Sequence, residues 1–391
     1  MGGTARRTIN ATGRATIGVA LALWMALGPA TACGRTSTTG TTDVPTAADW
    51  AWADVDPGPL ATREGVAVGG NDRWLVAWGG LSGSATNVMV HGDGAVYDRT
   101  AGRWYPMTPG PLGARHDAAA VWSQGRLFII GGAADTNLNG IGELRDGASF
   151  EPSTGTWRRL DAVPPQFTVR IDRSCKEFVE TGGRLWTTCA SSGAGVPAWR
   201  DGWATMAAPS TPVPNAARLV GNAGTTVLVT PFAEAGTAGR LRADVSQATT
   251  WVGASTAAAS VAMPAGPELG VAAALVGGRV ATATNALDRI RWFDPVRQRW
   301  SDGPEIPVPT ETVGIGVTPA LVRLGGRLAL LSPAQDLLLS DDGWERIPEP
   351  AAAPDVWLRW APIVAGSSVY VVSEPPATGL GGHRLFVLRR R

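Results

Sequence analysis

The sequence predicts an all-β fold, a seven-bladed β-propeller with four antiparallel strands in each blade. Three observations predict it: a composition suited to short strands and turns, seven regularly spaced tryptophans, and seven tight turns that each precede a short apolar strand. The 391 residues include 50 Gly, 29 Pro and 17 Trp, and 44% of them are hydrophobic. Many short strands joined by turns have this composition, whereas a helical protein does not.

Tryptophan recurs at intervals of 44 to 53 residues. The segment from Trp52 to Leu60 ends in Pro-Gly-Pro-Leu, and so does the segment from Trp104 to Leu112, at an offset of 52. The other members of the series are Trp157, Trp203, Trp251, Trp300 and Trp344. A period of about 48 residues is typical of a four-stranded propeller blade.

A tight turn followed by a short apolar strand occurs at a second set of positions. These strands lie at 74–78, 126–130, 184–186, 226–229, 279–281, 327–331 and 368–372. Two independent landmarks therefore give the same count of seven repeats.

In the first two repeats the apolar strand ends in a glycine pair, which an aromatic-acidic pair and then the tryptophan follow. The residues that carry this pattern are Gly79-Gly80, Tyr97-Asp98 and Trp104, and then Gly131-Gly132, Phe150-Glu151 and Trp157. Over residues 63–167 the spacing resembles the Kelch repeat of the galactose oxidase-like superfamily. The resemblance implies a Kelch-type propeller; the later repeats keep the tryptophan and lack the glycine pair.

The last repeat is incomplete at the C-terminus. After the strand near Tyr370 one more strand follows, about His383 to Leu388, and no tryptophan completes the blade. Trp52 lies ahead of the first full repeat, so we expect residues 49–57 to supply the missing outer strand. Such closure leaves only short, protected sheet edges. The propeller is therefore expected to be one domain, residues 49–391.

The first 32 residues have the organisation of a signal peptide. Arg6 and Arg7 precede an uncharged apolar run, Ile17–Gly28, which at about 12 residues is too short to span a bilayer. The stretch that ends in Cys33 resembles a bacterial lipobox, with Ala30 where that family usually has Leu. The resemblance implies a lipoprotein attached through Cys33, whereas ordinary cleavage would release a soluble product.

Residues 33–48 are rich in Thr, Ser and Gly, a composition that behaves as a flexible tether. We therefore expect an exported protein on the outer face of the cytoplasmic membrane, held there only by the lipid, or a secreted one if Cys33 is not acylated. Whether export follows the Sec or the Tat route stays open.

Two further cysteines, Cys175 and Cys189, flank a strand, a turn at 181–184 and a second strand. In an oxidising compartment this arrangement predicts a disulfide bond across a hairpin. Two buried free thiols are the alternative, and alkylation of both in the folded protein would establish it.

The longest connections join the second and third strands of blades 1 and 2, about Leu81 to Asp93 and Ala133 to Arg145. Binding residues tend to lie on loops of a rigid scaffold. The candidate ligand-binding residues on this face are His91, Asp93, Arg115, His116, Asp117, Asp135, Asn137, Asn139 and Glu143. Polar residues in such loops also satisfy turn geometry and interblade hydrogen bonds, which is the structural alternative.

Several function classes are not supported. The formal net charge is +1 and Lys176 is the only lysine, so we expect no nucleic-acid partner. We find no catalytic set, metal-ligand spacing or cofactor motif, and the copper site of galactose oxidase has no counterpart among the three Tyr and three His. The sequence thus favours a monomeric binding module for a protein or glycan.

The alternative is a small-molecule enzyme similar to the Kelch-type sialic-acid mutarotases, which would act on an anionic sugar at the channel mouth. The residues considered for it are Arg63, Glu64, Arg115, Arg218, Glu268 and Glu311.

Overall fold

The structure is a computed structural model in which residues 45–391 form one compact unit. The residues described are 45–84, 87–134, 144–164, 168–169, 178–181, 183–187, 190–191, 196–206, 218–221, 225–232, 240–247, 250–252, 260–262, 271–284, 288–307, 320–332, 336–348, 362–373 and 384–391.

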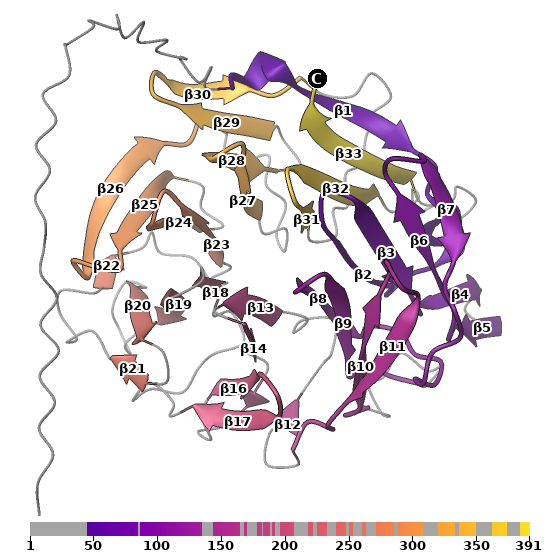
Figure 1. Cartoon of the computed structure of the whole chain (residues 1–391). Coiled ribbons are helices and arrows are strands. Elements are labelled where there is room, and N and C mark those ends of the chain that lie inside the picture. Colours follow the sequence, from indigo (N-terminus) through magenta and orange to yellow (C-terminus); the bar gives the residue numbers. More distant parts are fainter. Residues whose placement is uncertain are drawn as a thin grey trace, which may run out of the picture. The chain divides into compact units, whose positions relative to one another are not determined.

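The described residues form an all-β propeller of antiparallel sheets, seven of which contain a path of four strands (Figure 1). From the inner strand outward, the blades are β2 (Ala67–Gly70), β3 (Trp74–Trp78), β6 (Gly94–Asp98) and β7 (Arg103–Pro106); β8 (Ala119–Ser123), β9 (Arg126–Ile130), β10 (Gly147–Glu151) and β11 (Thr156–Leu160); β13 (Phe178–Thr181), β14 (Arg184–Thr187), β16 (Val196–Trp199) and β17 (Trp203–Met206); β18 (Arg218–Gly221), β19 (Thr225–Phe232), β20 (Arg240–Gln247) and β21 (Thr250–Val252); β23 (Val271–Val276), β24 (Arg279–Thr284), β25 (Arg289–Asp294) and β26 (Arg299–Glu305); β27 (Ala320–Leu324), β28 (Arg327–Leu331), β29 (Asp336–Ser340) and β30 (Gly343–Arg346); β31 (Ile363–Ala365), β32 (Ser368–Ser373), β33 (Arg384–Arg390) and β1 (Trp50–Val55).

Smaller elements decorate this frame. Strand β22 (Ser260–Ala262) pairs with β20, and two further strand pairs are β4 (Leu81–Ser84) with β5 (Asn87–Val90) and β12 (Thr168–Val169) with β15 (Ala190–Ser191). Two short 3-10 helices, Ala47–Asp49 and Gly58–Thr62, flank β1.

The inner strands lie nearest the centre of Figure 1 and contact one another in blade order. Strand β2 lies between β31 and β8, and the series continues through β13, β18, β23 and β27. The sheets therefore pack face to face around a common axis, as the repeat count predicts.

Register identifies equivalent positions in all seven blades. The second-strand residue that lies at the same distance from each tight turn is at most 1% exposed: Leu75, Leu127, Leu185, Val227, Val280, Leu328 and Val369. Their inner-strand partners are Gly70, Trp122, Glu180, Val220, Leu275, Arg323 and Val364. The seven apolar strands of the sequence are thus the second strands, each buried between two blades.

The blade tryptophans link neighbouring blades through their indole N–H groups. In four of them Nε1 donates to a backbone carbonyl oxygen of the chain that leaves the preceding blade, at 2.8 to 2.9 Å: Trp104 to Asp56, Trp157 to Thr108, Trp203 to Asp161 and Trp344 to Glu305. A large apolar ring with one polar atom suits this position, because the ring fills the outer part of the interface while the N–H is satisfied.

The N-terminal strand completes the last blade, as the sequence predicts. Strand β1 pairs with β33 over six residue pairs, from Trp50 opposite Arg390 to Val55 opposite Leu385. The last strand therefore runs two residues further than the expected Leu388. Trp50 and Trp52, 1% and 8% exposed, pack into a core shared with β28 and β29 of the preceding blade.

We predict that Trp52→Ala lowers the free energy of unfolding by about 3–5 kcal/mol, because it removes a buried ring. It also removes the N–H donated at 3.0 Å to a carboxylate oxygen of buried Asp336. Trp104 is only partly buried, so Trp104→Ala should cost no more. Thermal and urea melts of the two variants measure both effects. A Trp52→Ala melt that overlays wild type would show that the N-terminal strand does not contribute to the last blade.

Candidate functional site

The connection between the second and third strands of blade 1 is a hairpin rather than an irregular loop. Strands β4 and β5 pair from Leu81 opposite Val90 to Ser84 opposite Asn87, outside the blade sheet. Gly83, at φ 111°, permits the close approach of Asn87 near the tip. Asn87 is exposed and Met89 is 59% exposed, so one face of the hairpin is open to a partner.

Backbone hydrogen bonds fix the base of this hairpin to the segments that enter the inner strands. Glu64 and Leu81 exchange two N–H to O bonds of 2.8 Å. The N–H of Gly80 donates to the Arg115 carbonyl oxygen, and that of Arg115 to the His91 carbonyl oxygen. We call residues 63–66, 79–93 and 113–118 the loop platform. Its conformation is set by the scaffold and not by its own side chains alone.

Two arginines hold the platform in the same way in blades 1 and 2. The Nη1 atom of Arg115 donates at 3.0 Å to the carbonyl oxygen of Gly131, and its Nη1 and Nη2 donate at 2.8 and 3.1 Å to the carboxylate of Asp146. At the position 52 residues earlier, Arg63 donates to the Gly79 carbonyl oxygen and to the carboxylate of Asp93. We call this arrangement the arginine clamp.

The glycine pairs exist because the clamp brings backbones together. Gly80 and Gly132 have φ of 94° and 90°, where L side chains are strained. A Cβ atom on either would lie 2.7 Å from a carbonyl oxygen of the segment it bonds, that of Glu64 or His116. The feature that carries the Kelch resemblance is therefore a close-approach site between loops.

Electrostatics differ between the two clamps. Arg115 is 2% exposed, and its hydrogen bonds hold the pKa of Asp146 below the usual range of an aspartate. The Asp93 side chain is 70% exposed, and the hydrogen bond from Arg63 likewise lowers its pKa. Burial, followed by the charge of Arg63, lowers the pKa of His91, whose Nε2 lies 2.7 Å from the Ser82 hydroxyl. His91 is accordingly neutral at pH 7.

The nine predicted binding residues fall into three groups. His91 and Asp93 lie at the edge of the platform. Arg115, His116 and Asp117 are 2–4% exposed, and His116 Nδ1 lies 2.8 Å from a carboxylate oxygen of Asp117. These three side chains hold backbone together, so contact with a ligand stays a prediction that their burial does not favour. The remaining four lie outside the described residues: Asp135, Asn137, Asn139 and Glu143.

Sequence reasoning missed the clamp role of Arg63 and the exposed Met89. The 52-residue offset that aligns Trp52 with Trp104 also aligns Arg63 with Arg115, so the equivalence was present in the repeat. Nothing comparable marks Met89, whose exposure depends on how the hairpin is held.

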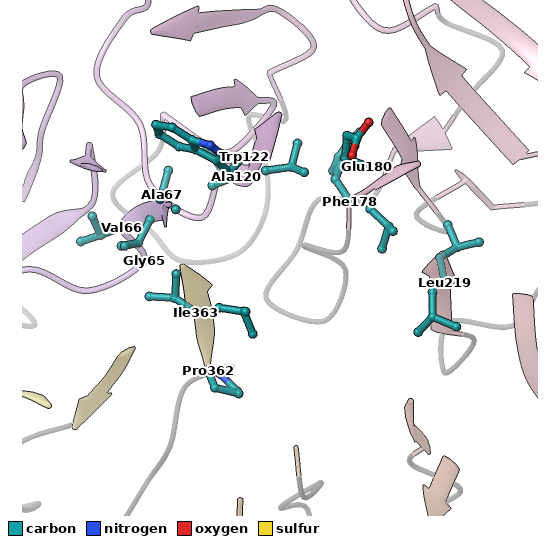
Figure 2. A pocket seen from close by; sticks show the side chains of 18 of the residues that line it. Gly65, Val66, Ala67, Ala120, Trp122, Phe178, Glu180, Leu219, Pro362 and Ile363 are labelled. Atoms are coloured by element: carbon teal, nitrogen blue, oxygen red, sulfur yellow. The ribbon is translucent and has the colours of Figure 1, made fainter. Parts of the chain in front are cut away.

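A cavity of about 770 Å³ lies on the axis and is lined by residues from the inner strands of all seven blades (Figure 2). Its walls are mostly apolar, with Ala67, Ala120, Leu219 and Ile363 among them. The charged side chains that line it are Arg63, Glu64, Glu180 and Arg323. Arg63 and Glu64 precede β2 and so belong to the end of the channel beside the loop platform.

The cysteine hairpin has the predicted strands, since β13 pairs with β14 from Phe178 opposite Thr187 to Thr181 opposite Arg184. Cys175 and Cys189 lie outside the described residues, and their disulfide bond stays a prediction.

Within the ranges that the structure describes, no three His, Cys, Asp or Glu side chains cluster as metal ligands would. In the same ranges, no helix has the length and hydropathy needed to cross a membrane. No protein-family model matches the chain, and no curated protein is significantly similar to it. The function must therefore be argued from the geometry.

We predict that Asp146→Ala lowers the free energy of unfolding by about 2 kcal/mol, because it leaves the buried Arg115 guanidinium without its counter-charge. Asp93→Ala is the matched control; its carboxylate is exposed, so the loss should stay below about 1 kcal/mol. Urea titrations at pH 7 compare the two variants.

The pH dependence follows from the sign of the shift. Because folding lowers the pKa of Asp146, its contribution is present above the unfolded-state value near 3.8 and is lost as pH falls through the lower folded-state value. The difference between wild type and Asp146→Ala should therefore shrink below about pH 4. Equal losses for Asp146→Ala and Asp93→Ala at pH 7 would contradict the structural role of the buried clamp.

Proposed function

We propose that the protein is an exported Kelch-type propeller, tethered to the membrane through Cys33, that binds a protein or glycan on its loop platform. The observation that carries this proposal is the β4–β5 hairpin, which stands outside every blade sheet and yet is fixed at its base by backbone hydrogen bonds and the Arg63 clamp. A decoration that the scaffold itself does not need, held rigidly, is suited to recognition.

The hairpin offers a preorganised surface of mixed chemistry. Exposed Met89 provides an adaptable apolar contact, while Asn87 and Asp93 beside it provide an amide and a carboxylate. Since the base of the hairpin is already ordered, binding has to immobilise few further backbone groups. These properties favour an interaction module over a flexible loop.

The start of the compact unit is compatible with a tether on the opposite face. The Ala47 N–H donates to the carboxylate of Glu345 on β30, and a Cβ on Gly325, in the tight turn between β27 and β28, would lie 3.1 Å from Pro45. The chain thus enters beside the tight turns, whereas the hairpin extends from the long-connection face. A flexible tether of residues 33–44 would span about 20 Å and leave the platform free.

The described residues give less support to the sugar-enzyme alternative. Arg63 and Arg115 are engaged by Asp93 and Asp146, and Arg218 and Glu64 also have partners. Glu268 and Glu311 lie outside the described residues. A general acid or base would need a group free to exchange a proton with substrate.

The test places a photo-crosslinking amino acid at two exposed apolar positions on opposite faces. Met89→p-benzoylphenylalanine reports on the hairpin, and Val296→p-benzoylphenylalanine, at an 89% exposed position in the turn between β25 and β26, is the matched control. After irradiation of intact cells, we expect a discrete cross-linked species from position 89 and none from position 296. Products from both positions alike, or from neither, would contradict a partner on the loop platform.

The tether has its own test, because a binding module could also be secreted. Metabolic labelling with a fatty acid should mark the wild-type chain and not Cys33→Ala, since acylation requires the thiol. Equal labelling of the two chains, or none, would remove lipid attachment at Cys33 from the proposal.

A further inference from the structure

The end of the channel beside the tight turns is built from one residue of each blade. These are the inner-strand residues that pair with the buried second-strand positions, and each of them lines the cavity: Gly70, Trp122, Glu180, Val220, Leu275, Arg323 and Val364. Four are glycine or aliphatic and offer no directional contact. Recognition at this level depends on Trp122, Glu180 and Arg323.

Arg323 differs from the clamp arginines. Arg63 and Arg115 are each held by an aspartate, whereas no described residue forms a hydrogen bond or ion pair with the exposed side chain of Arg323. Its charge therefore faces a cavity whose walls are mostly apolar. In such surroundings a guanidinium attracts an anion more strongly than it does on an open surface.

The other charged lining groups do not cancel this charge locally. Arg63 is paired with Asp93, and Glu64 belongs to the opposite end. Glu180 lies in blade 3, three blades from Arg323, and its Oε1 accepts the N–H of Gly183 at 2.8 Å, so it also serves the turn of its own hairpin. An anion placed beside Arg323 is separated from Glu180 by the width of the channel.

Trp122 supplies a surface for the apolar part of a ligand. Its ring is partly exposed in the channel wall (Figure 2), and no described residue accepts a hydrogen bond from its Nε1. A flat apolar group can stack on an indole, and the free N–H adds a donor. The cavity volume lies within the range of sites for small organic molecules.

We propose that the tight-turn end of the channel binds a small aromatic monoanion, a carboxylate or sulfonate, with the anionic group on Arg323 and the apolar body along Trp122. This site is separate from the loop platform and does not depend on its function.

Two dyes test the proposal with the whole exported chain. One is 8-anilinonaphthalene-1-sulfonate, an aromatic monoanion, and the other is N-phenyl-1-naphthylamine, which has the same aromatic body without the charge. We expect saturable binding of one sulfonate dye per chain, at least about 10-fold tighter than the neutral dye, which is the contribution of a charge-assisted hydrogen bond. Fluorescence titration and calorimetry give affinity and stoichiometry.

Variants locate the site. Arg323→Met should weaken the sulfonate dye about 10-fold or more and leave the neutral dye unchanged, while the thermal melt stays that of wild type. Trp122→Leu should weaken both dyes. Arg158→Met is the matched control, because Arg158 is an exposed arginine on the outer strand β11. The proposal is overturned if the charged dye binds no tighter than the neutral one, if neither saturates, or if Arg158→Met weakens binding as much as Arg323→Met.

Discussion

The pairing of β1 with β33 is the interaction on which the rest of the structure depends. In a ring of blades each sheet buries its faces against two neighbours, so a blade left with three strands weakens the packing on both sides. The six residue pairs of this sheet also prevent β33 from presenting an unpaired apolar edge. Trp50 and Trp52 extend the effect into the preceding blade, since both pack against its strands.

A second constraint acts between loops rather than between sheets. The arginine clamp joins the chain entering an inner strand to the glycine pair that ends the second strand and to the aspartate before the third. It therefore fixes the long connections relative to the blade core. A buried guanidinium that satisfies carbonyl oxygens and a carboxylate together orders three chain segments at once. The loop platform is rigid for this reason, and its exposed groups can be specific without being numerous.

Periodicity made the scaffold predictable. A tight turn, an apolar strand and a tryptophan each depend on local sequence, and their sevenfold recurrence determines the count, the second strands and the incomplete last blade. The polar residues of the site were less predictable. Arg115, His116 and Asp117 have the residue types of a binding site, yet they lie 2–4% exposed, because the neighbouring loop covers them. Burial of this kind depends on contacts between segments, such as His116 with Ala133, that no local pattern encodes.

The channel shows the same limit from the other side. Arg323 is one of several arginines scattered through the sequence, and nothing in its neighbourhood distinguishes it from Arg327 or Arg346. Only the register of β27 with β28 places it in the cavity, opposite the buried Leu328. Equivalent positions in other blades are apolar, so its significance depends on the comparison of blades and not on a motif.

The most direct test of the account is a disulfide engineered between the two termini of the ring. Ala51 lies opposite Arg389 in the β1–β33 pair, where antiparallel partners are about 5.5 Å apart at Cα, within the range of a disulfide. Mass spectrometry of the oxidised Ala51→Cys/Arg389→Cys chain should detect the peptide pair joined within one molecule and independent of protein concentration. The register-shifted pair Ala51→Cys/Arg391→Cys should form it far less. Absence of the intramolecular cross-link, or its equal formation in the shifted pair, would contradict closure of the last blade by the N-terminal strand.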